Sequence, residues 1–346
     1  MINQDRPNLF SFATSELSQD AFICWLAAWA DPKWQHADSV LHQTAQRFIA
    51  SMIQKVKPDY DLSNLKTVGV RRQVEKLDIL IEINKELPDK LAILVEDKTH
   101  TSNHSDQLNR YYGQIREAGY TEDQMIPLYF KTGYQSKFNT LGVFKTYLRS
   151  DFLEVLRTGK SRGVDNAIFK DFLQHLETLD AAIREFSTKN PKDWQADDWR
   201  GFFMVLYDSR GELYEVSEDD GANWDYVANP SGGFFGFWWY FKNLPDQLYT
   251  PYLQLEGDTL CFKIEAKVEA QRNEAREKAY YQLTEAGRQL NAAVERPKRM
   301  GNGRYMTVLR WKDDYRVYED GKLAVDATLN NLKKAQQILD LAFSDN

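Results

Sequence analysis

The chain has 346 residues and a formal net charge of -7 at pH 7, with 42% hydrophobic and 13% aromatic residues. This length is enough for a sizeable core and suggests two domains or one large domain. The acidic balance excludes a surface that is basic throughout, although a local basic stripe would still allow nucleic-acid binding. No apolar run approaches the ~20 residues that cross a bilayer, so we expect no membrane contact.

Two further features predict a cytoplasmic protein. The two cysteines, Cys24 and Cys261, lie far apart in apolar stretches, as expected of reduced thiols rather than of a disulfide or a metal cluster. The segment Met1–Pro7 has no basic region followed by an apolar run, so we expect no signal peptide.

Periodic apolar residues in the first half of the chain predict both helices and strands. The expected helices cover residues 15–30, 39–56 and 105–117, and the expected strands cover residues 67–74, 76–83, 91–97 and 125–131. The order is helix, strands, helix, strand. This order indicates an α/β layer structure around a mixed sheet.

The second half of the chain has a different texture. Residues 147–187 keep a helical pattern and are followed by the connector Asn190–Asp193, so we place a domain boundary near residue 192. The predicted domains are therefore 1–192 and 193–346. In the second domain the expected strands cover residues 235–241, 252–255, 260–266 and 305–311, and the expected helices cover residues 274–294 and 330–343. We interpret it as an α+β domain that recognises a substrate or a partner.

The aromatic block Phe234–Phe241 of this second domain has two interpretations. Phe, Trp and Tyr favour strands, so the block is typical of a buried strand in a core. Aromatic rings can also stack on unpaired nucleic-acid bases.

Three charged residues lie inside otherwise apolar strands, where an unpaired charge is costly. Asp78 belongs to one predicted strand, and Glu96 and Lys98 lie at the end of the next. Because alternate residues of a strand share a face, Glu96 and Lys98 point the same way, and Asp78 can join them if the two strands pair. The opposite, apolar face comprises Leu77, Ile79, Ile81 and Ile83 on the first strand and Ile93 and Val95 on the second.

This arrangement predicts a site for a hard divalent cation. Mg²⁺ prefers oxygen ligands, and the carboxylates of Asp78 and Glu96 with the backbone carbonyl of Asp97 would provide them. A bound cation lowers the pKa of its water, and Lys98 would hold that water or stabilise the developing oxyanion. The alternative is an exposed strand whose wet face carries an ordinary Glu–Lys pair.

Two helices contribute further candidates. Gln107 and Tyr111 lie one turn apart on the helix after Glu96, so both can reach the end of that strand. A glutamine amide can bond a water or a metal ligand, and a tyrosine hydroxyl can hold a phosphate oxygen. Glu16, in the first turn of the first helix, can bring another carboxylate to the cation. The alternatives are a surface helix with a packed tyrosine ring, and an acid that only complements the helix dipole.

In order and identity these residues resemble the PD-(D/E)xK nuclease superfamily over about residues 8–135. Asp78 lies in one strand, the triplet Glu96-Asp97-Lys98 in the next, and helices precede and follow them. Leu77 stands where the proline of the superfamily's name would be, and many members lack that proline.

Two further segments strengthen the resemblance. The Gln-x-x-x-Tyr spacing of Gln107 and Tyr111 is similar to that of the RecB and lambda-exonuclease branch. The segments Asn8–Phe12 and Asp106–Tyr112 look like a group of bacterial members of the superfamily.

The resemblance implies a restriction-endonuclease-like α-β-β-β-α-β core and metal-dependent hydrolysis of a nucleic-acid phosphodiester. Asp78 and Glu96 would be ligands of Mg²⁺ or Mn²⁺, Lys98 the catalytic lysine, and Glu16 and Gln107 supporting residues. On this analogy we expect DNA rather than RNA as substrate, endonuclease rather than exonuclease action, and a role in restriction or phage defence. Cutting both strands of a duplex would suggest paired sites in a homodimer.

Basic residues outside this cluster are candidate contacts to a nucleic-acid backbone. Arg71 and Arg72 precede the Asp78 strand, and Lys298 and Arg299 belong to the densest basic cluster of the second domain. The alternative for each pair is a solvated surface.

Two rival functions stay open at this point. A binding module would keep the fold without useful catalysis and recognise nucleic acid or protein through its second domain. A zinc hydrolase would use His100 and His104, which flank the polar loop after Lys98, although the sequence shows no evident third ligand.

Overall fold

A computed structural model of the chain describes residues 6–74, 76–99, 107–138, 141–217, 220–229, 232–243 and 248–344. The chain forms two compact units, Met1–Asp180 and Ala181–Asn346. Their division falls within a helix, earlier in the chain than the boundary near residue 192 that the sequence suggests.

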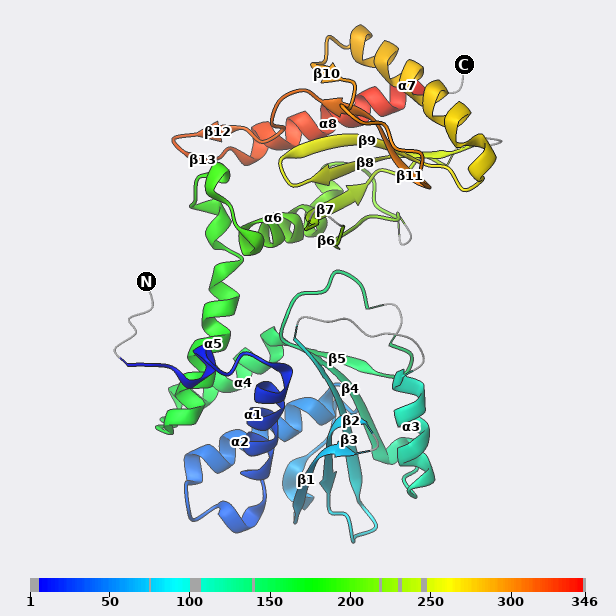
Figure 1. The fold of residues 1–346 in the computed structure, drawn as a ribbon. Coiled ribbons are helices and arrows are strands. Elements are labelled where there is room, and N and C mark those ends of the chain that lie inside the picture. Colours follow the sequence, from blue (N-terminus) through cyan, green and yellow to red (C-terminus); the bar gives the residue numbers. More distant parts are fainter. Residues whose placement is uncertain are drawn as a thin grey trace. The chain divides into compact units, whose positions relative to one another are not determined.

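The first unit is built on a mixed five-stranded sheet (Figure 1). Its strands are β1 (Val68–Val74), β2 (Leu77–Ile83), β3 (Leu91–Lys98), β4 (Met125–Lys131) and β5 (Lys145–Leu148), in that spatial order. Its helices are α1 (Glu16–Ala28), α2 (Ser39–Gln54), α3 (Gln107–Glu117), α4 (Arg149–Ser161) and α5 (Ala167–Ala182). The first three strands pair antiparallel and the last three parallel. The α-β-β-β-α-β core and the mixed sheet confirm the predicted fold class.

Helices cover both faces of this sheet. Ile79 of β2 and Val95 of β3 pack in a large core that also contains residues of α1, α2, α4 and α5. On the other face, Leu80 and Leu94 pack with Leu108 of α3. The alternation expected for β2 and β3 therefore holds along most of both strands, and the face that carries Glu96 lies partly beneath a helix.

Leu77 is an exception to the predicted alternation. It belongs to the core on the α3 side, whereas Ile79 belongs to the opposite one. Gln73, near the end of β1, and Lys76, just before β2, have positive φ of 51° and 73°. The departure of Leu77 from strict alternation therefore falls next to an irregular stretch of backbone.

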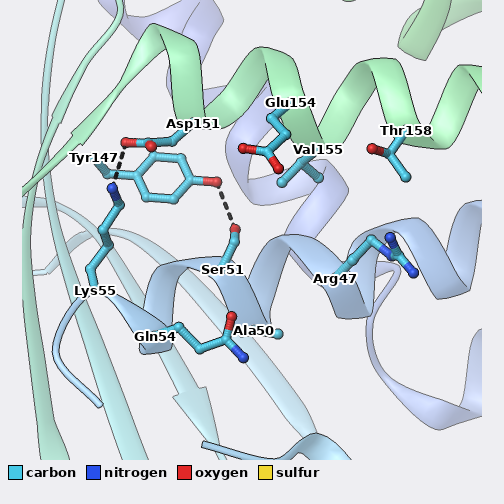
Figure 2. A pocket seen from close by; sticks show the side chains of 10 residues that line it. All are labelled: Arg47, Ala50, Ser51, Gln54, Lys55, Tyr147, Asp151, Glu154, Val155 and Thr158. Carbon is cyan, nitrogen blue, oxygen red and sulfur yellow. Dashed lines mark hydrogen bonds and ion pairs between the residues drawn. The ribbon is translucent and has the colours of Figure 1, made fainter. Parts of the chain in front are cut away.

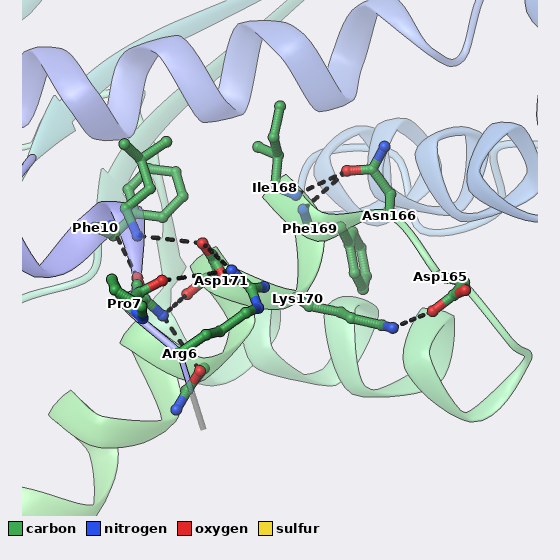
Figure 3. Close-up of polar contacts among 12 residues, drawn as sticks. Arg6, Pro7, Phe10, Asp165, Asn166, Ile168, Phe169, Lys170 and Asp171 are labelled. Carbon is green, nitrogen blue, oxygen red and sulfur yellow. Dashed lines mark hydrogen bonds and ion pairs between the residues drawn. The ribbon is translucent and has the colours of Figure 1, made fainter. Parts of the chain in front are cut away.

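The segment before α1 is fixed on α5. Arg6 pairs with Asp171, and the side-chain amide of Asn8 donates to the Asp171 carbonyl oxygen at 2.8 Å. Figure 3 shows Arg6 and Asp171 beside Phe10. The Phe10 ring packs edge-on against Phe172 with centroids 4.9 Å apart. This anchor sets where α1 begins and therefore where its first turn lies.

The second unit is built on a six-stranded antiparallel sheet with strand order β10-β11-β9-β8-β7-β6. The strands are β6 (Asn223–Val227), β7 (Phe234–Trp239), β8 (Thr250–Glu256), β9 (Thr259–Glu265), β10 (Val294–Glu295) and β11 (Tyr305–Trp311), with a separate pair, β12 (Tyr318–Glu319) and β13 (Lys322–Leu323). The helices are α6 (Ala196–Asp208), α7 (Arg272–Gln289) and α8 (Val325–Phe343). The unit is α+β, as predicted.

Several predicted elements need correction. The helical pattern expected from residue 147 begins only after β5, because Tyr147 pairs with Phe130 in the sheet, and it is then divided into α4 and α5. The helix expected to reach Val294 ends at Gln289, because Asn291 adopts a positive φ of 46° and Val294 pairs with Trp311. Helix α6 was not predicted.

The structure also describes the two cysteines and the apolar character of the helices. Cys24 and Cys261 are free thiols, the first half-buried and the second buried. Among the described residues no helix combines the length and apolar character that a membrane crossing needs.

Candidate functional site

Asp78, Glu96 and Lys98 meet where β2 begins and β3 ends. The ammonium Nζ of Lys98 lies 2.8 Å from Oε1 of Glu96 and 3.3 Å from Oδ2 of Asp78. It also donates to the backbone carbonyl oxygen of Asp97 at 2.9 Å. The structure thus brings together the three side chains that the sequence placed in neighbouring strands.

The pairing of β2 with β3 explains this convergence. Ile79 lies opposite Val95 in the antiparallel register, so the next pair along places Asp78 beside Glu96. The Asp78 carboxylate turns back to the neighbouring strand and accepts the backbone N–H of Asp97 at 2.9 Å. This bond holds the Asp78 side chain at the strand end.

Burial and neighbouring charges shift the pKa values of Glu96 and Lys98. Glu96 is 0% exposed. This burial, together with the charge of Asp78, raises the pKa of Glu96 to about 7, against the opposing pull of Lys98. Burial alone would lower the pKa of Lys98, but the hydrogen bond and charge of Glu96, with Asp78 and Glu16, raise it above its usual value. Lys98 therefore stays a cation.

The oxygens around the Lys98 ammonium fit a hard cation. Two carboxylates and a backbone carbonyl, all within hydrogen-bonding distance of one positive atom, are the ligand types that Mg²⁺ prefers. The second oxygen of Glu96, Oε2, is buried and has no hydrogen-bond partner in the described part of the chain. No group of three or more His, Cys, Asp or Glu side chains among the described residues could hold an ion by itself. A cation would therefore depend on the Asp97 carbonyl and on displacement of the ammonium.

Helix α3 supports the buried carboxylate. The side-chain amide of Gln107 donates to Oε1 of Glu96 at 3.1 Å and to the hydroxyl of Tyr111 at 2.6 Å. Tyr111 is only 2% exposed, with its ring in the core under α3. Its predicted contact with a phosphate stays untested, and this burial favours a different role, in which Tyr111 orients Gln107.

Helix α1 brings Glu16 to the same end of β3. Oε1 of Glu16 accepts the backbone N–H of Thr99, the residue after Lys98, at 3.0 Å. Its charge contributes to the raised pKa of both Glu96 and Lys98. Glu16 is thus close enough to act on the cluster electrostatically, and its role as a ligand of the cation stays a prediction.

Comparison with known families identifies the unit that carries this cluster. A model of the PD-(D/E)XK nuclease superfamily matches residues 7–196, more than half of the chain. The chain belongs to this superfamily. Comparisons with curated proteins and with solved structures find no match. The matched region contains all of β1 to β5 and α1 to α5, and it stops at the first residue of α6.

Sequence reasoning missed a second polar group of this nuclease unit, on the α1 face of β3. The side chain of Asp97 is 1% exposed and accepts the amide of Gln19 at 2.5 Å, and Gln19 in turn accepts the hydroxyl of Thr132. Burial and the nearby charge of Asp20 raise the pKa of Asp97 well above its usual value. Burial, then the charge of Asp78, raises the pKa of Asp20 to about 6.

A sequence signal for this group exists. Gln19 and Asp20 follow Glu16 by three and four positions, so all three lie on one face of α1. Polar residues at that spacing on a buried helix indicate a polar site beneath it.

The predicted basic contacts are dispersed. Arg71 is half exposed and its Nε lies 3.0 Å from Oε2 of Glu82, on the α3 side of the sheet. Arg72 is exposed, and its charge lowers the pKa of Asp20 in α1. The two arginines therefore lie on opposite faces of the sheet. Lys298 and Arg299 are exposed in the second unit, between β10 and β11. His100 and His104, the predicted zinc ligands, lie outside the described residues.

A cavity of about 430 Å³ lies elsewhere in the nuclease unit, between α2 and α4 (Figure 2). Lys55 Nζ lies 2.9 Å from Oδ2 of Asp151 across it, and the hydroxyls of Ser51 and Tyr147 are 2.7 Å apart. None of the predicted site residues lines this cavity. Concavity alone would therefore select a different place from the cluster that the sequence predicts.

Gly133, which follows β4, touches the backbone that leaves β3. A Cβ at this position would lie 1.7 Å from the carbonyl oxygen of Thr99, whose amide Glu16 accepts. Gly133→Ala is therefore expected to push Thr99 aside and to destabilise the protein by about 1–3 kcal/mol, the usual cost of overpacking. Urea unfolding measures this change.

Gly113 of α3 provides the matched control. A Cβ there meets nothing within 4 Å, so Gly113→Ala is expected to stabilise the protein by about 0.5–1 kcal/mol. An unchanged urea midpoint for Gly133→Ala, with Gly113→Ala behaving as expected, would show that the two strand ends are not in contact.

Proposed function

We propose that the first unit is a divalent-metal-dependent nuclease that hydrolyses phosphodiester bonds of DNA, with Mg²⁺ or Mn²⁺ as cofactor. The observation that carries the proposal is the environment of Lys98 Nζ, where Asp78, Glu96 and the Asp97 carbonyl all direct oxygen atoms at one positive charge. Membership of the PD-(D/E)XK superfamily supports the reaction class.

The cation would be held by the carboxylates of Asp78 and Glu96 and the carbonyl of Asp97. When bound, it would acidify a water and offset the negative charge that develops on the phosphate. In the reaction a water oxygen bonds to phosphorus and gives up one proton, the bond to the departing sugar oxygen breaks, and that oxygen takes up one proton.

Lys98 has an electrostatic role in this scheme. In the metal-free protein the pKa of Lys98 is raised, so the side chain is a cation that can donate hydrogen bonds to developing negative charge. Gln107 holds Glu96 in place, and Glu16 holds the backbone after Lys98 through Thr99. Both are positioning residues.

Supercoiled plasmid DNA tests the proposal, because a closed circle offers no ends and its cleavage requires endonuclease action. Cleavage is expected with Mg²⁺ or Mn²⁺ and is expected to fall by about 10²–10⁴-fold in EDTA, since a catalytic metal is worth several kcal/mol. An RNA transcript and a linear duplex, used in parallel, separate DNA from RNA and endonuclease from exonuclease action.

One observation favours a second function, a binding module on the nuclease fold. The Lys98 ammonium already pairs with both carboxylates, as an inactive descendant would allow. Calorimetry distinguishes the two: DNA binding without Mg²⁺ or Mn²⁺ binding, and without cleavage of any substrate, supports the module and contradicts the nuclease. Tightly held zinc would instead support the hydrolase that uses His100 and His104.

A role in restriction or phage defence, and action as a homodimer, belong to the same proposal. Both rest on the superfamily membership alone. Loss of phage protection in cells that carry an inactive variant would test the first, and the mass of the protein in solution would test the second.

A further inference from the structure

The second unit contains a cavity of about 560 Å³ on one face of its six-stranded sheet. The opposite face is covered by helices; for example, Phe203 of α6 stacks on Phe237 of β7, with centroids 6.2 Å apart. Trp238 is the next residue of β7 and therefore points to the cavity side, which it lines. The cavity lies within the usual size range of small-molecule sites.

Aromatic rings form much of the cavity wall. Phe241 and Tyr252 stack on each other with centroids 4.7 Å apart and planes at 11°. Trp238 is half-buried, and Tyr305 of β11 is 56% exposed. Partly exposed tryptophan and tyrosine rings that line a cavity are suited to stack on a flat ring.

The cavity floor carries polar side chains that neutralise one another. Oε1 of Glu256 accepts Lys263 Nζ at 2.8 Å and the amide of Gln254 at 3.0 Å. Gln254 and Lys263 are only 7% and 9% exposed, so this floor is built into the sheet. No hydrogen bond within the described residues uses Oε1 of Gln254 or Oε2 of Glu256. Because both residues line the cavity, these two acceptors are available to a ligand bound in it.

The charged and polar side chains that line the cavity favour some classes of ligand over others. A phosphate group would meet Glu256 and Glu265, which are paired with Lys263 and Arg304, so the cavity offers it little uncompensated positive charge. A cationic ligand would meet the ammonium of Lys263. A neutral, flat ring with donors and acceptors on its edge fits both the rings and the floor.

We propose that this cavity binds a nucleobase, with its ring against Trp238 and Tyr305, its edge toward Gln254 and Glu256, and its sugar and phosphate outside. The inference rests on the proposed function, which makes nucleic acid the natural source of such a ring. In a duplex, stacked neighbours cover the faces of each base and pairing occupies its edge. The base that enters this cavity is therefore unpaired and unstacked. The second unit thereby recognises single-stranded or distorted nucleic acid, or a free nucleotide.

Fluorescence anisotropy tests the proposal with the full chain in EDTA, where no strand is cut. The probes are a labelled single strand of mixed sequence and an abasic strand with the same number of phosphates. Wild type is expected to prefer the strand with bases. Trp238→Ala and Tyr305→Ala are each expected to weaken binding of that strand by about 10- to 100-fold, and to leave binding of the abasic strand unchanged.

Two controls keep the test sharp. Tyr305 is mostly exposed, so its truncation leaves the core intact even if Trp238→Ala does not fold. Tyr281 of α7 is 74% exposed and does not line the cavity, so Tyr281→Ala is expected to bind both strands as wild type does. The four nucleoside monophosphates, as competitors, separate the sources: competition supports a free nucleotide, and its absence supports a strand.

The outcome is separable from the proposed nuclease activity. Base-dependent binding without cleavage of plasmid, linear duplex or RNA would support the cavity proposal and contradict the nuclease. Plasmid cleavage together with equal binding of the two strands, or with Tyr305→Ala binding like wild type, would overturn the cavity proposal and leave the nuclease intact.

Discussion

Lys98→Ala is expected to bind a divalent cation more tightly than the wild-type protein and yet to lose cleavage. The ammonium contacts Glu96, Asp78 and the Asp97 carbonyl, which are the same oxygens that a metal ion would use. Removing it takes away a competing positive charge, so affinity for Mn²⁺ should rise at least about tenfold. Removing it also takes away a donor to the transition state, so cleavage should fall by about 10²–10³-fold.

The same substitution should make stability depend more strongly on metal. Without Lys98, the fully buried Glu96 loses its nearest cation, so the metal-free variant is expected to be less stable by about 1–3 kcal/mol. An ion that binds only the folded state restores this stability. The rise in melting temperature on adding Mn²⁺ should therefore be larger for Lys98→Ala than for wild type.

Calorimetric titration with Mn²⁺, thermal unfolding with and without the ion, and plasmid cleavage together measure these effects. Lys66, an exposed lysine just before β1, supplies the control, and Lys66→Ala should match wild type in all three. Weaker Mn²⁺ binding by Lys98→Ala would contradict the competition and place the cation elsewhere.

The central triad of the site could be predicted because strands impose a simple rule on their side chains. Asp78, Glu96 and Lys98 are charges in apolar strands, and the alternation of side chains along each strand is enough to place them on one face. What alternation does not supply is the register, and the pairing of Ile79 with Val95 determines which charges meet. The contact of one ammonium with three oxygens depends on that register.

The second polar group was missed for a different reason. Gln19 and Asp20 lie in a helix whose other residues follow an apolar stripe, and both are buried, at 6% and 2% exposure. Periodicity treats such residues as a solvated face. Only the approach of α1 to the end of β3 shows that they meet Asp97.

In the second unit, the aromatic block predicted a strand but could not show which of its rings would be buried. Residues Phe234–Trp239 of the block form a strand, which ends before Tyr240 at a positive φ of 59°, and the strand's residues divide between two faces: Trp239 is buried, and Trp238 lines a cavity. The core interpretation therefore holds for one face only, and the stacking interpretation stays a prediction. The sequence could not show this because the covering of one sheet face by α6 depends on packing between distant segments.

Asp78→Asn is expected to keep the fold and to lose both metal affinity and cleavage. The Asp78 carboxylate accepts the Asp97 amide at 2.9 Å, and the side-chain carbonyl of an asparagine can accept it equally, so β2 and β3 should stay paired. The substitution removes one of the two carboxylates that would hold the cation. Cleavage should therefore fall by about 10²–10⁴-fold, the value of several kcal/mol of metal catalysis.

The variant should also shift how metal binding depends on pH. In the wild type the pKa of Glu96 is about 7, raised first by burial and then by the charge of Asp78. Protons therefore compete with the cation below about pH 7, and affinity for Mn²⁺ should rise as the pH passes through 7. Without the Asp78 charge the pKa of Glu96 falls, so the remaining, weaker affinity of Asp78→Asn should rise at a lower pH.

Glu82 supplies a stringent control for this prediction, because it is another buried acid on the same face of β2. Its carboxylate lies 3.0 Å from Arg71 and accepts the Tyr120 hydroxyl at 2.9 Å, away from the cation site. Glu82→Gln should lower stability, because Arg71 loses its partner, while Mn²⁺ affinity and cleavage stay at wild-type values. Equal loss of cleavage in Glu82→Gln and Asp78→Asn would mean that both substitutions reduce cleavage only by destabilising the fold. Asp78 would then not be a ligand of the metal.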